Sequence, residues 1–148
     1  MELRPLGDVT LRYTSLESLD YGAGGQIYGT MEGEITGDQL RGTLRLTNLA
    51  PKRPDNVNCP TLRGLLVTQD DATIWVELTG IATLRPADQA RVFVTSCTFR
   101  TGDTRYQWLN TVFGVLEGVL ESVSAGGVAR GRAYACDPTI SATELDPR

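Results

Sequence analysis

Residues 99–110 gather side chains suited to chemistry between two apolar runs. Tyr106, Trp108 and Asn110 share one parity, so in an extended strand the phenol, the indole and the amide point to the same side. That arrangement predicts a ligand-facing cluster. If Asp103 instead caps a single helical turn that runs through Trp108, the same side chains form a plug that closes one end of a barrel.

A glutamate and two arginines are the other candidates for a site. Glu32 and Arg41 lie on strands joined by a short turn, so they could form an exposed ion pair, which contributes roughly 0 to 1 kcal/mol. Alternatively, Arg41 and Arg63 bind an anionic or enolate-like oxygen while Glu32 moves a proton. The candidate catalytic residues are therefore Glu32, Arg41 and Tyr106, and the candidate substrate-binding residues are Arg63, Trp108 and Asn110.

The composition excludes several kinds of chemistry. The chain has no histidine, so the commonest general base and metal ligand is absent from it. Lys52 is the only lysine and lies in a proline-rich loop, which argues against a Schiff base. No dense Asp/Glu group indicates a metal site, and a net charge of -4 without a basic run argues against nucleic-acid binding. We therefore expect no cofactor and no metal.

The cysteines indicate a reducing compartment. Cys59, Cys97 and Cys136 are odd in number and widely spaced, which fits neither a disulfide framework nor a zinc site. Cys97 lies on a strand face without a histidine to activate it, so we expect it to act as a small hydrophobe. Residues 1–5 do not resemble a signal peptide and no apolar run is long enough to span a membrane, so we expect a cytoplasmic protein that binds no membrane.

These side chains must be positioned by β-strands, because apolar and polar residues alternate along most of the chain. The predicted strands cover residues 9–13, 26–34, 40–47, 62–68, 73–84, 91–100, 111–122 and 128–136. Residues 15–20 are predicted to form a turn, and residues 86–90 are the only place where we expect a short helical turn.

Many short strands without a long helix predict an all-β fold, either an antiparallel barrel or a sandwich. The 16 glycines favour the more strongly bent barrel, because glycine inside a strand marks a bulge or a close approach of another backbone. We therefore expect one closed antiparallel β-barrel of about eight to ten strands with at most one short helix. The barrel would occupy residues 1–136, and residues 137–148 would form a surface tail.

Three motifs together resemble a known family: Gly-Thr-Met-Glu-Gly at residues 29–33, Leu-Arg-Gly-Thr at residues 40–43, and the stretch at residues 99–110. They resemble the small β-barrel proteins of the domain of unknown function family 3237. The resemblance implies a calycin-like (lipocalin-like) barrel with a polar-lined interior. The motif positions that match the family are Glu32, Arg41, Arg63, Tyr106, Trp108 and Asn110. Thr61 and Gly64 depart from the acidic residue and the tyrosine usual there, which implies a reshaped pocket.

The leading functional hypothesis is a cofactor-independent enzyme of the lyase, isomerase or cyclase type. Its substrate would be a small, partly aromatic or enolisable metabolite held inside the barrel. Glu32 would transfer the proton, Arg41 and Arg63 would stabilise negative charge, Tyr106 would donate a proton or hydrogen bond, and Trp108 would stack on the substrate. The alternatives are a non-catalytic carrier or sensor of a small hydrophobic ligand and a structural or assembly subunit. We also expect a homodimer.

Overall fold

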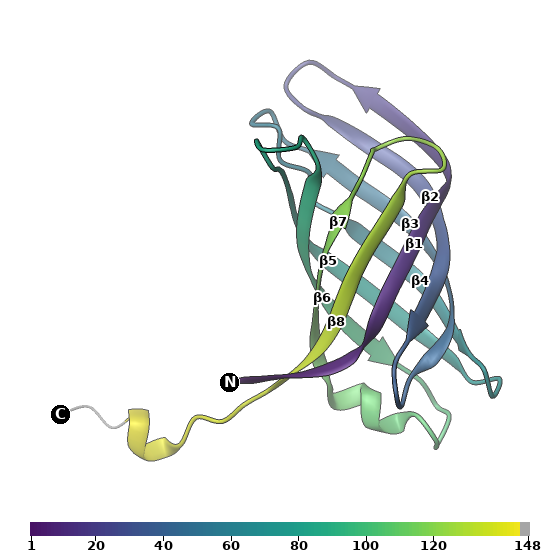
Figure 1. The fold of residues 1–148 in the computed structure, drawn as a ribbon, viewed down its shortest axis with the longest axis vertical. Helices are drawn as coiled ribbons and strands as arrows, with labels where there is room; N and C mark the ends of the chain where they lie inside the picture. Colours follow the sequence, from purple (N-terminus) through teal and green to yellow (C-terminus); the bar gives the residue numbers. More distant parts are fainter. Residues whose placement is uncertain (146–148) are drawn as a thin grey trace.

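Alternating apolar and polar side chains give the described part of the chain eight strands, which close into a barrel (Figure 1). The computed structural model describes residues 1–145. Each strand pairs antiparallel with the next, and β1 closes the barrel against β8. The strands are β1 (Glu2–Asp20), β2 (Gly25–Thr36), β3 (Arg41–Lys52), β4 (Thr61–Thr68), β5 (Thr73–Leu84), β6 (Arg91–Arg100), β7 (Phe113–Leu120) and β8 (Val128–Asp137). The predicted closed antiparallel barrel is confirmed.

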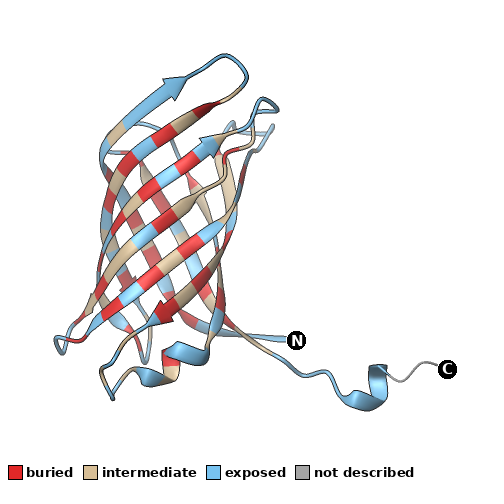
Figure 2. Ribbon diagram, turned by 180° about the vertical axis from the view of Figure 1, so that it is seen from behind, coloured by how far each residue is buried: buried red, intermediate tan, exposed pale blue. Residues whose placement is uncertain are grey.

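The core lies inside the barrel. Buried and exposed residues alternate along the strands (Figure 2), because successive side chains of a strand point to opposite faces of the sheet. One parity of each strand therefore fills the interior. The fully buried large side chains include Leu40, Leu66, Ile74 and Leu109. A filled interior near these residues leaves space for a ligand only elsewhere in the barrel.

Glycines allow the strands to pass close together where the sheet bends. A Cβ atom on Gly33 of β2 would lie 1.8 Å from the carbonyl oxygen of Thr10 on β1. A Cβ atom on Gly29 would lie 2.9 Å from Cε1 of the Tyr13 ring. Gly29 thus makes room for a large side chain inside the barrel, as the close-approach interpretation of strand glycines predicts.

Two local predictions need correction. Residues 15–20 are not a turn but the last part of β1, which continues beyond an irregularity between Tyr13 and Ser15. The bulge changes the side-chain parity of the strand, so the alternation of residues 9–13 does not extend through it. Lys52 does not lie in the proline-rich loop but is the last residue of β3, which extends beyond its predicted end at residue 47. Residues 86–90 form the expected single helical turn, in which the amide of Gln89 donates to the carbonyl oxygen of Arg85 at 2.8 Å.

Within residues 1–145, the helical segments are two short 3₁₀ helices, η1 (Gln107–Thr111) and η2 (Ala142–Leu145). η1 lies across one barrel end, and we call this the closed end (Figure 1). The loops 53–60, 85–90 and 121–127 lie at the opposite end, which we call the mouth. Asp137, the first residue of the predicted tail at 137–148, is instead the last residue of β8 and pairs with Glu2. Residues 138–145 contain η2 and extend away from the barrel, and residues 146–148 lie outside the described part.

Candidate functional site

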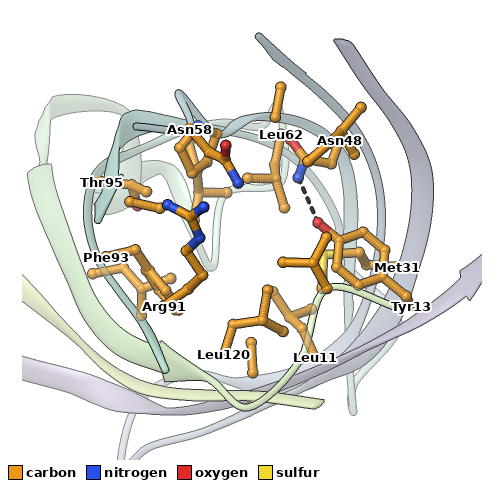
Figure 3. Close-up of a pocket in the computed structure, with 18 residues that line it drawn as sticks. Leu11, Tyr13, Met31, Asn48, Asn58, Leu62, Arg91, Phe93, Thr95 and Leu120 are labelled. Atoms are coloured by element: carbon orange, nitrogen blue, oxygen red, sulfur yellow. Dashed lines mark hydrogen bonds between the residues drawn. The ribbon is translucent and has the colours of Figure 1, made fainter. Parts of the chain in front are cut away.

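A cavity of about 60 Å³ lies inside the barrel toward the mouth (Figure 3). Its walls are mainly apolar side chains from all around the barrel: Leu11, Ile27, Met31, Leu62, Leu78, Phe93, Leu116 and Leu120. Tyr13, Asn48, Asn58, Arg91 and Thr95 supply its polar groups. An apolar pocket with a few convergent polar groups is the usual form of a small-molecule site. The volume suits a fragment-sized group, since drug-sized ligands occupy roughly 300–1,000 Å³.

Tyr13 and Asn48 form a buried pair in the wall of this cavity. Asn48 Nδ2 donates to the Tyr13 hydroxyl at 2.8 Å, and Asn48 Oδ1 accepts from the backbone amide of Thr61 at 3.1 Å. Both Asn48 bonds fix its orientation, and the β1 bulge and Gly29 seat the Tyr13 ring. Burial raises the pKa of Tyr13, although the bond from Asn48 opposes this. Tyr13 is therefore a protonated phenol at neutral pH and can donate its hydrogen to a ligand.

Thr95 and Asn58 add two further polar groups. Thr95 lies on the inward face of β6 and is only 3 % exposed, and its Oγ1 has no hydrogen-bond partner among residues 1–145. Asn58 is held by backbone hydrogen bonds to Ala82 and turns its side chain into the cavity (Figure 3). An unpaired buried hydroxyl costs about 1–3 kcal/mol, so such groups mark places where a ligand oxygen or a water is favoured.

Arg91 lies at the mouth, at the first position of β6. Its Nη1 donates to the carbonyl oxygen of Asn56 at 2.5 Å, and its Nη2 donates to Asn56 Oδ1 at 2.8 Å. Asn56 has φ 68°, a left-handed conformation that asparagine tolerates better than most residues. The guanidinium is thereby held over the opening of the cavity (Figure 3).

Glu32 and Arg41 lie on the outer surface of the barrel rather than in this cavity. The β2–β3 register places Glu32 opposite Arg45, while Arg41 stands opposite Thr36 at the turn. Arg41 Nε donates to the carbonyl oxygen of Gly37 at 3.1 Å. The expected Glu32–Arg41 neighbour pair is therefore not formed. The two residues nevertheless share one hairpin, as the sequence predicts.

Arg63 also points outward, from β4. It faces Glu77 in the β4–β5 register, with 3.3 Å between Arg63 Nε and Glu77 Oε1, and Arg100 approaches the same carboxylate oxygen at 3.3 Å. These exposed ion pairs lie on the outside of the sheet. The structure thus does not bring Arg63 together with the other candidate residues around one ligand space.

Tyr106, Trp108 and Asn110 lie at the closed end, in and beside η1. Leu109 is fully buried between them, and Tyr106 and Trp108 pack against the core. The Asn110 side chain clasps Thr101: its Oδ1 accepts from the Thr101 amide at 2.8 Å, and its Nδ2 donates to the Thr101 carbonyl at 2.9 Å. This geometry matches the alternative in which the stretch closes one end of the barrel. The expected cap is not formed, because η1 begins after Tyr106 and Asp103 accepts from the amide of Arg105 instead.

The Tyr106 hydroxyl is already engaged. It donates to Asp70 Oδ1 at 2.8 Å, and this hydrogen bond is the main cause that raises the pKa of Tyr106. Asp70 also accepts from Thr68 and lies 3.2 Å from Arg105, and the hydrogen bonds from Thr68 and Tyr106 lower the pKa of Asp70. The network ties the β4–β5 turn to the loop before η1.

The sequence contains a signal for the polar residues of the cavity, although its charged residues are more conspicuous. Asn48 follows the buried Leu44 and Leu46 at the same parity, and Thr95 shares its parity with the buried Cys97 and Phe99. A polar residue at an inward position breaks an otherwise apolar strand face. That break marks a group that needs a partner inside the barrel.

Other kinds of site are not evident in the described part of the chain. Among residues 1–145, no group of three or more Cys, Asp or Glu side chains is arranged to hold a metal ion. None of the helical segments within that range is long and apolar enough to cross a membrane. Cys97 is 5 % exposed and burial raises its pKa to about 12, so its thiol stays protonated, as expected of a structural cysteine.

Comparisons with known proteins agree with this architecture. The family model described as "Protein of unknown function (DUF3237)" matches residues 2–129. The comparison with curated proteins gave no match. A β-barrel-like protein from Acinetobacter baumannii superposes with a TM-score of 0.76 at 19 % identity, covering 90 % of this chain and 94 % of that one.

Two further solved structures share the fold. A conserved protein of unknown function from Rhodopseudomonas palustris gives a TM-score of 0.75 at 21 % identity, covering 91 % of this chain and 97 % of that one. A protein from Penicillium herquei described as an enzyme gives a TM-score of 0.65 at 21 % identity, covering 89 % and 93 %. At these identities the likeness concerns the fold.

Proposed function

The chain belongs to the DUF3237 family of proteins of unknown function, and we propose that its barrel binds a small, mostly apolar molecule that carries a carbonyl-like oxygen. The observation that carries this proposal is the apolar cavity into which the neutral groups of Tyr13 and Thr95 turn. Apolar walls favour an apolar body, because its burial contributes about 25 cal/mol per Å². The hydroxyl groups favour an oxygen that accepts hydrogen bonds.

The interior supports this function better than either set of residues at the surface. Tyr106 and Asn110 already satisfy their polar groups within the closed end. Glu32 lies in an outer depression beside Arg12 and Arg45, without apolar walls that would enclose a ligand. A ligand at the closed end would have to break the hydrogen bonds of Tyr106 and Asn110, which would offset much of its binding free energy. In the cavity, a ligand instead supplies the Thr95 hydroxyl with a partner.

Paired probes of the same shape test the proposal. Acetophenone carries a carbonyl oxygen, whereas α-methylstyrene has a methylene group in its place, and titration calorimetry measures both dissociation constants. We expect acetophenone to bind the natural protein about five- to tenfold more tightly, since a net hydrogen bond is worth about 1 kcal/mol. Thr95→Val and Tyr13→Phe should each reduce this preference. Thr83→Val is the matched control, because Thr83 is exposed on the outer face.

Binding of neither probe, with circular dichroism showing folded protein, would overturn the proposal. Equal affinities of the natural protein for both probes would remove the role of the hydroxyl groups. An equal change in the preference for acetophenone in Thr83→Val and Thr95→Val would place the carbonyl oxygen of the ligand outside the barrel interior.

A cofactor-independent enzyme of the isomerase, lyase or cyclase type is the second candidate. It is favoured by the buried, protonated Tyr13 phenol, which can stabilise a carbonyl oxygen that develops negative charge as a neighbouring carbon loses its proton. A fold relative described only as an enzyme is an example of catalysis on this fold and does not indicate the type of reaction. Since the described cavity lining holds no carboxylate, the proton would pass to water or to a basic group of the substrate itself.

Exchange of the acetophenone methyl hydrogens for deuterium tests this candidate. In D₂O, proton NMR should show faster loss of the methyl signal with the natural protein than with buffer alone. Tyr13→Phe should remove most of the acceleration, because general acid catalysis contributes roughly 10² to 10⁴-fold. Bound acetophenone that exchanges no faster than free acetophenone would leave the protein as a binder and rule out this chemistry for the probe.

A further inference from the structure

Arg91 carries the one charged group among the described side chains that line the cavity. The other lining groups are apolar or neutral, so any charge selectivity of the pocket depends on this guanidinium. β6 places Arg91 and Thr95 on the same inward face, with Phe93 between them. A ligand that reaches Thr95 from the mouth therefore passes the guanidinium.

The present partners of Arg91 are neutral. Both acceptors are amide oxygens of Asn56, one from the backbone and one from the side chain. The neighbouring carboxylate of Asp55 is bound by Arg53. Arg91 thus uses two guanidinium nitrogens to bind two oxygens, as arginine does when it binds a carboxylate, but neither of these oxygens carries a charge.

We infer that the ligand is a small organic acid whose carboxylate binds Arg91 at the mouth while its apolar body enters the cavity. The inference rests on the proposed function, because it concerns the same cavity. The carboxylate replaces the two Asn56 oxygens or binds beside them, and this gives a charge-assisted bidentate pair in place of neutral hydrogen bonds. Arg91 is half-buried, so water screens such a pair less than it screens one on the open surface.

The inference distinguishes Arg91 from the other arginines near the mouth. Arg85 is bound by Asp88 through two hydrogen bonds of 3.0 and 2.6 Å, and Arg130 lies 2.8 Å from Glu121. Both have carboxylate partners on the exposed surface. Arg85 is therefore a matched control: the same residue type, near the same end of the barrel, already paired and outside the cavity lining.

Two probes that differ only in the acid group test the inference. 4-Acetylbenzoate carries a carboxylate, and 4′-methylacetophenone carries a methyl group in its place. Titration calorimetry is performed on the natural protein, Arg91→Gln, Arg91→Lys and Arg85→Gln. We expect Arg91→Gln to weaken the binding of 4-acetylbenzoate at least about tenfold, because hydrogen bonds to charged groups are worth roughly 1.5–3 kcal/mol. The neutral probe should change less than about twofold.

The other variants separate a binding role from a structural one. Arg91→Lys should keep part of the affinity for the acid, since it retains the charge and loses the fork, and Arg85→Gln should keep all of it. Raising the salt concentration should weaken the binding of 4-acetylbenzoate to the natural protein and should have a smaller effect on its binding to Arg91→Gln.

Each failure has a distinct reading. If 4′-methylacetophenone binds the natural protein and Arg91→Gln leaves 4-acetylbenzoate unchanged, the inference about the acid is overturned and the proposed function stands. If neither probe binds the natural protein, the proposed function fails with it. Equal loss of both probes in Arg91→Gln would assign Arg91 to shaping the mouth and would also overturn the inference.

Discussion

At the scale of single residues, the cavity depends on neutral polar atoms in an apolar interior. Asn48 satisfies its amide with Tyr13 and Thr61, so it orients the phenol without introducing charge. Thr95 has no such partner, and an unpaired buried hydroxyl disfavours the folded state by about 1–3 kcal/mol. A barrel that keeps this residue tolerates that cost, and ligand binding offers a physical reason for doing so.

The candidate site was only partly predictable from the sequence. Charged residues such as Glu32 and Arg63 attract attention first, but on a barrel with an apolar interior they remain outside, where water solvates them. The interior parity of Thr95 was readable from its predicted strand, whereas Asn48 lies just beyond the predicted strand at 40–47. Their convergence with Tyr13 was not, because it requires closure of β1, β3 and β6 around one space and a bulge after Tyr13.

At the scale of elements, most strand positions followed from the alternating pattern. β4, β5 and β6 match their predicted limits closely, because clear turns at residues 69–72 and 85–90 separate them. β1 was underestimated because its bulge shifts the parity. η1 could be predicted only as one of two alternatives, since Tyr106, Trp108 and Asn110 fit an extended segment or a helical turn equally well. The burial of Leu109 decides between them.

Asn110→Ala tests whether the closed end serves stability or ligand binding. The change removes both hydrogen bonds to Thr101, so we expect the free energy of unfolding to fall by about 1–2 kcal/mol. Acetophenone affinity should stay within about twofold of the natural value, since the cavity lies toward the mouth. Urea denaturation followed by circular dichroism measures the first quantity, and calorimetry measures the second.

Thr104→Ala is the control for that loop, because Thr104 is exposed and its replacement removes little buried contact. Its stability should stay within about 0.5 kcal/mol of the natural protein. A loss of ligand affinity in Asn110→Ala at unchanged stability would contradict the structural role. That result would indicate that the residues around η1 take part in ligand binding.

At the scale of the whole molecule, the barrel interior favours neutral groups, so the stability of the folded state falls at alkaline pH. Burial raises the pKa of Cys97 from 9.0 to about 12 and raises the pKa of Tyr13 as well. Below pH 9 both groups are protonated in the folded and the unfolded chain. Between pH 9 and 12 the unfolded thiol loses its proton while the buried one keeps it, so the unfolded state becomes more favourable.

The natural protein should therefore lose stability as the pH rises from 9 to 11, with a contribution of about 2 kcal/mol from Cys97. Urea denaturation at intervals of pH gives the free energy of unfolding. Cys97→Ala opens a small cavity and therefore lowers the free energy of unfolding at neutral pH. Between pH 9 and 11, however, the free energy of unfolding of this variant should fall by about 2 kcal/mol less than that of the natural protein, because the variant lacks the thiol. Val76→Ala, at a buried position on β5, opens a cavity without removing a titratable group and should keep the natural slope. Identical slopes for Cys97→Ala and the natural protein would show that the interior admits the thiolate, and the premise that the barrel interior around Cys97 excludes charge would fail.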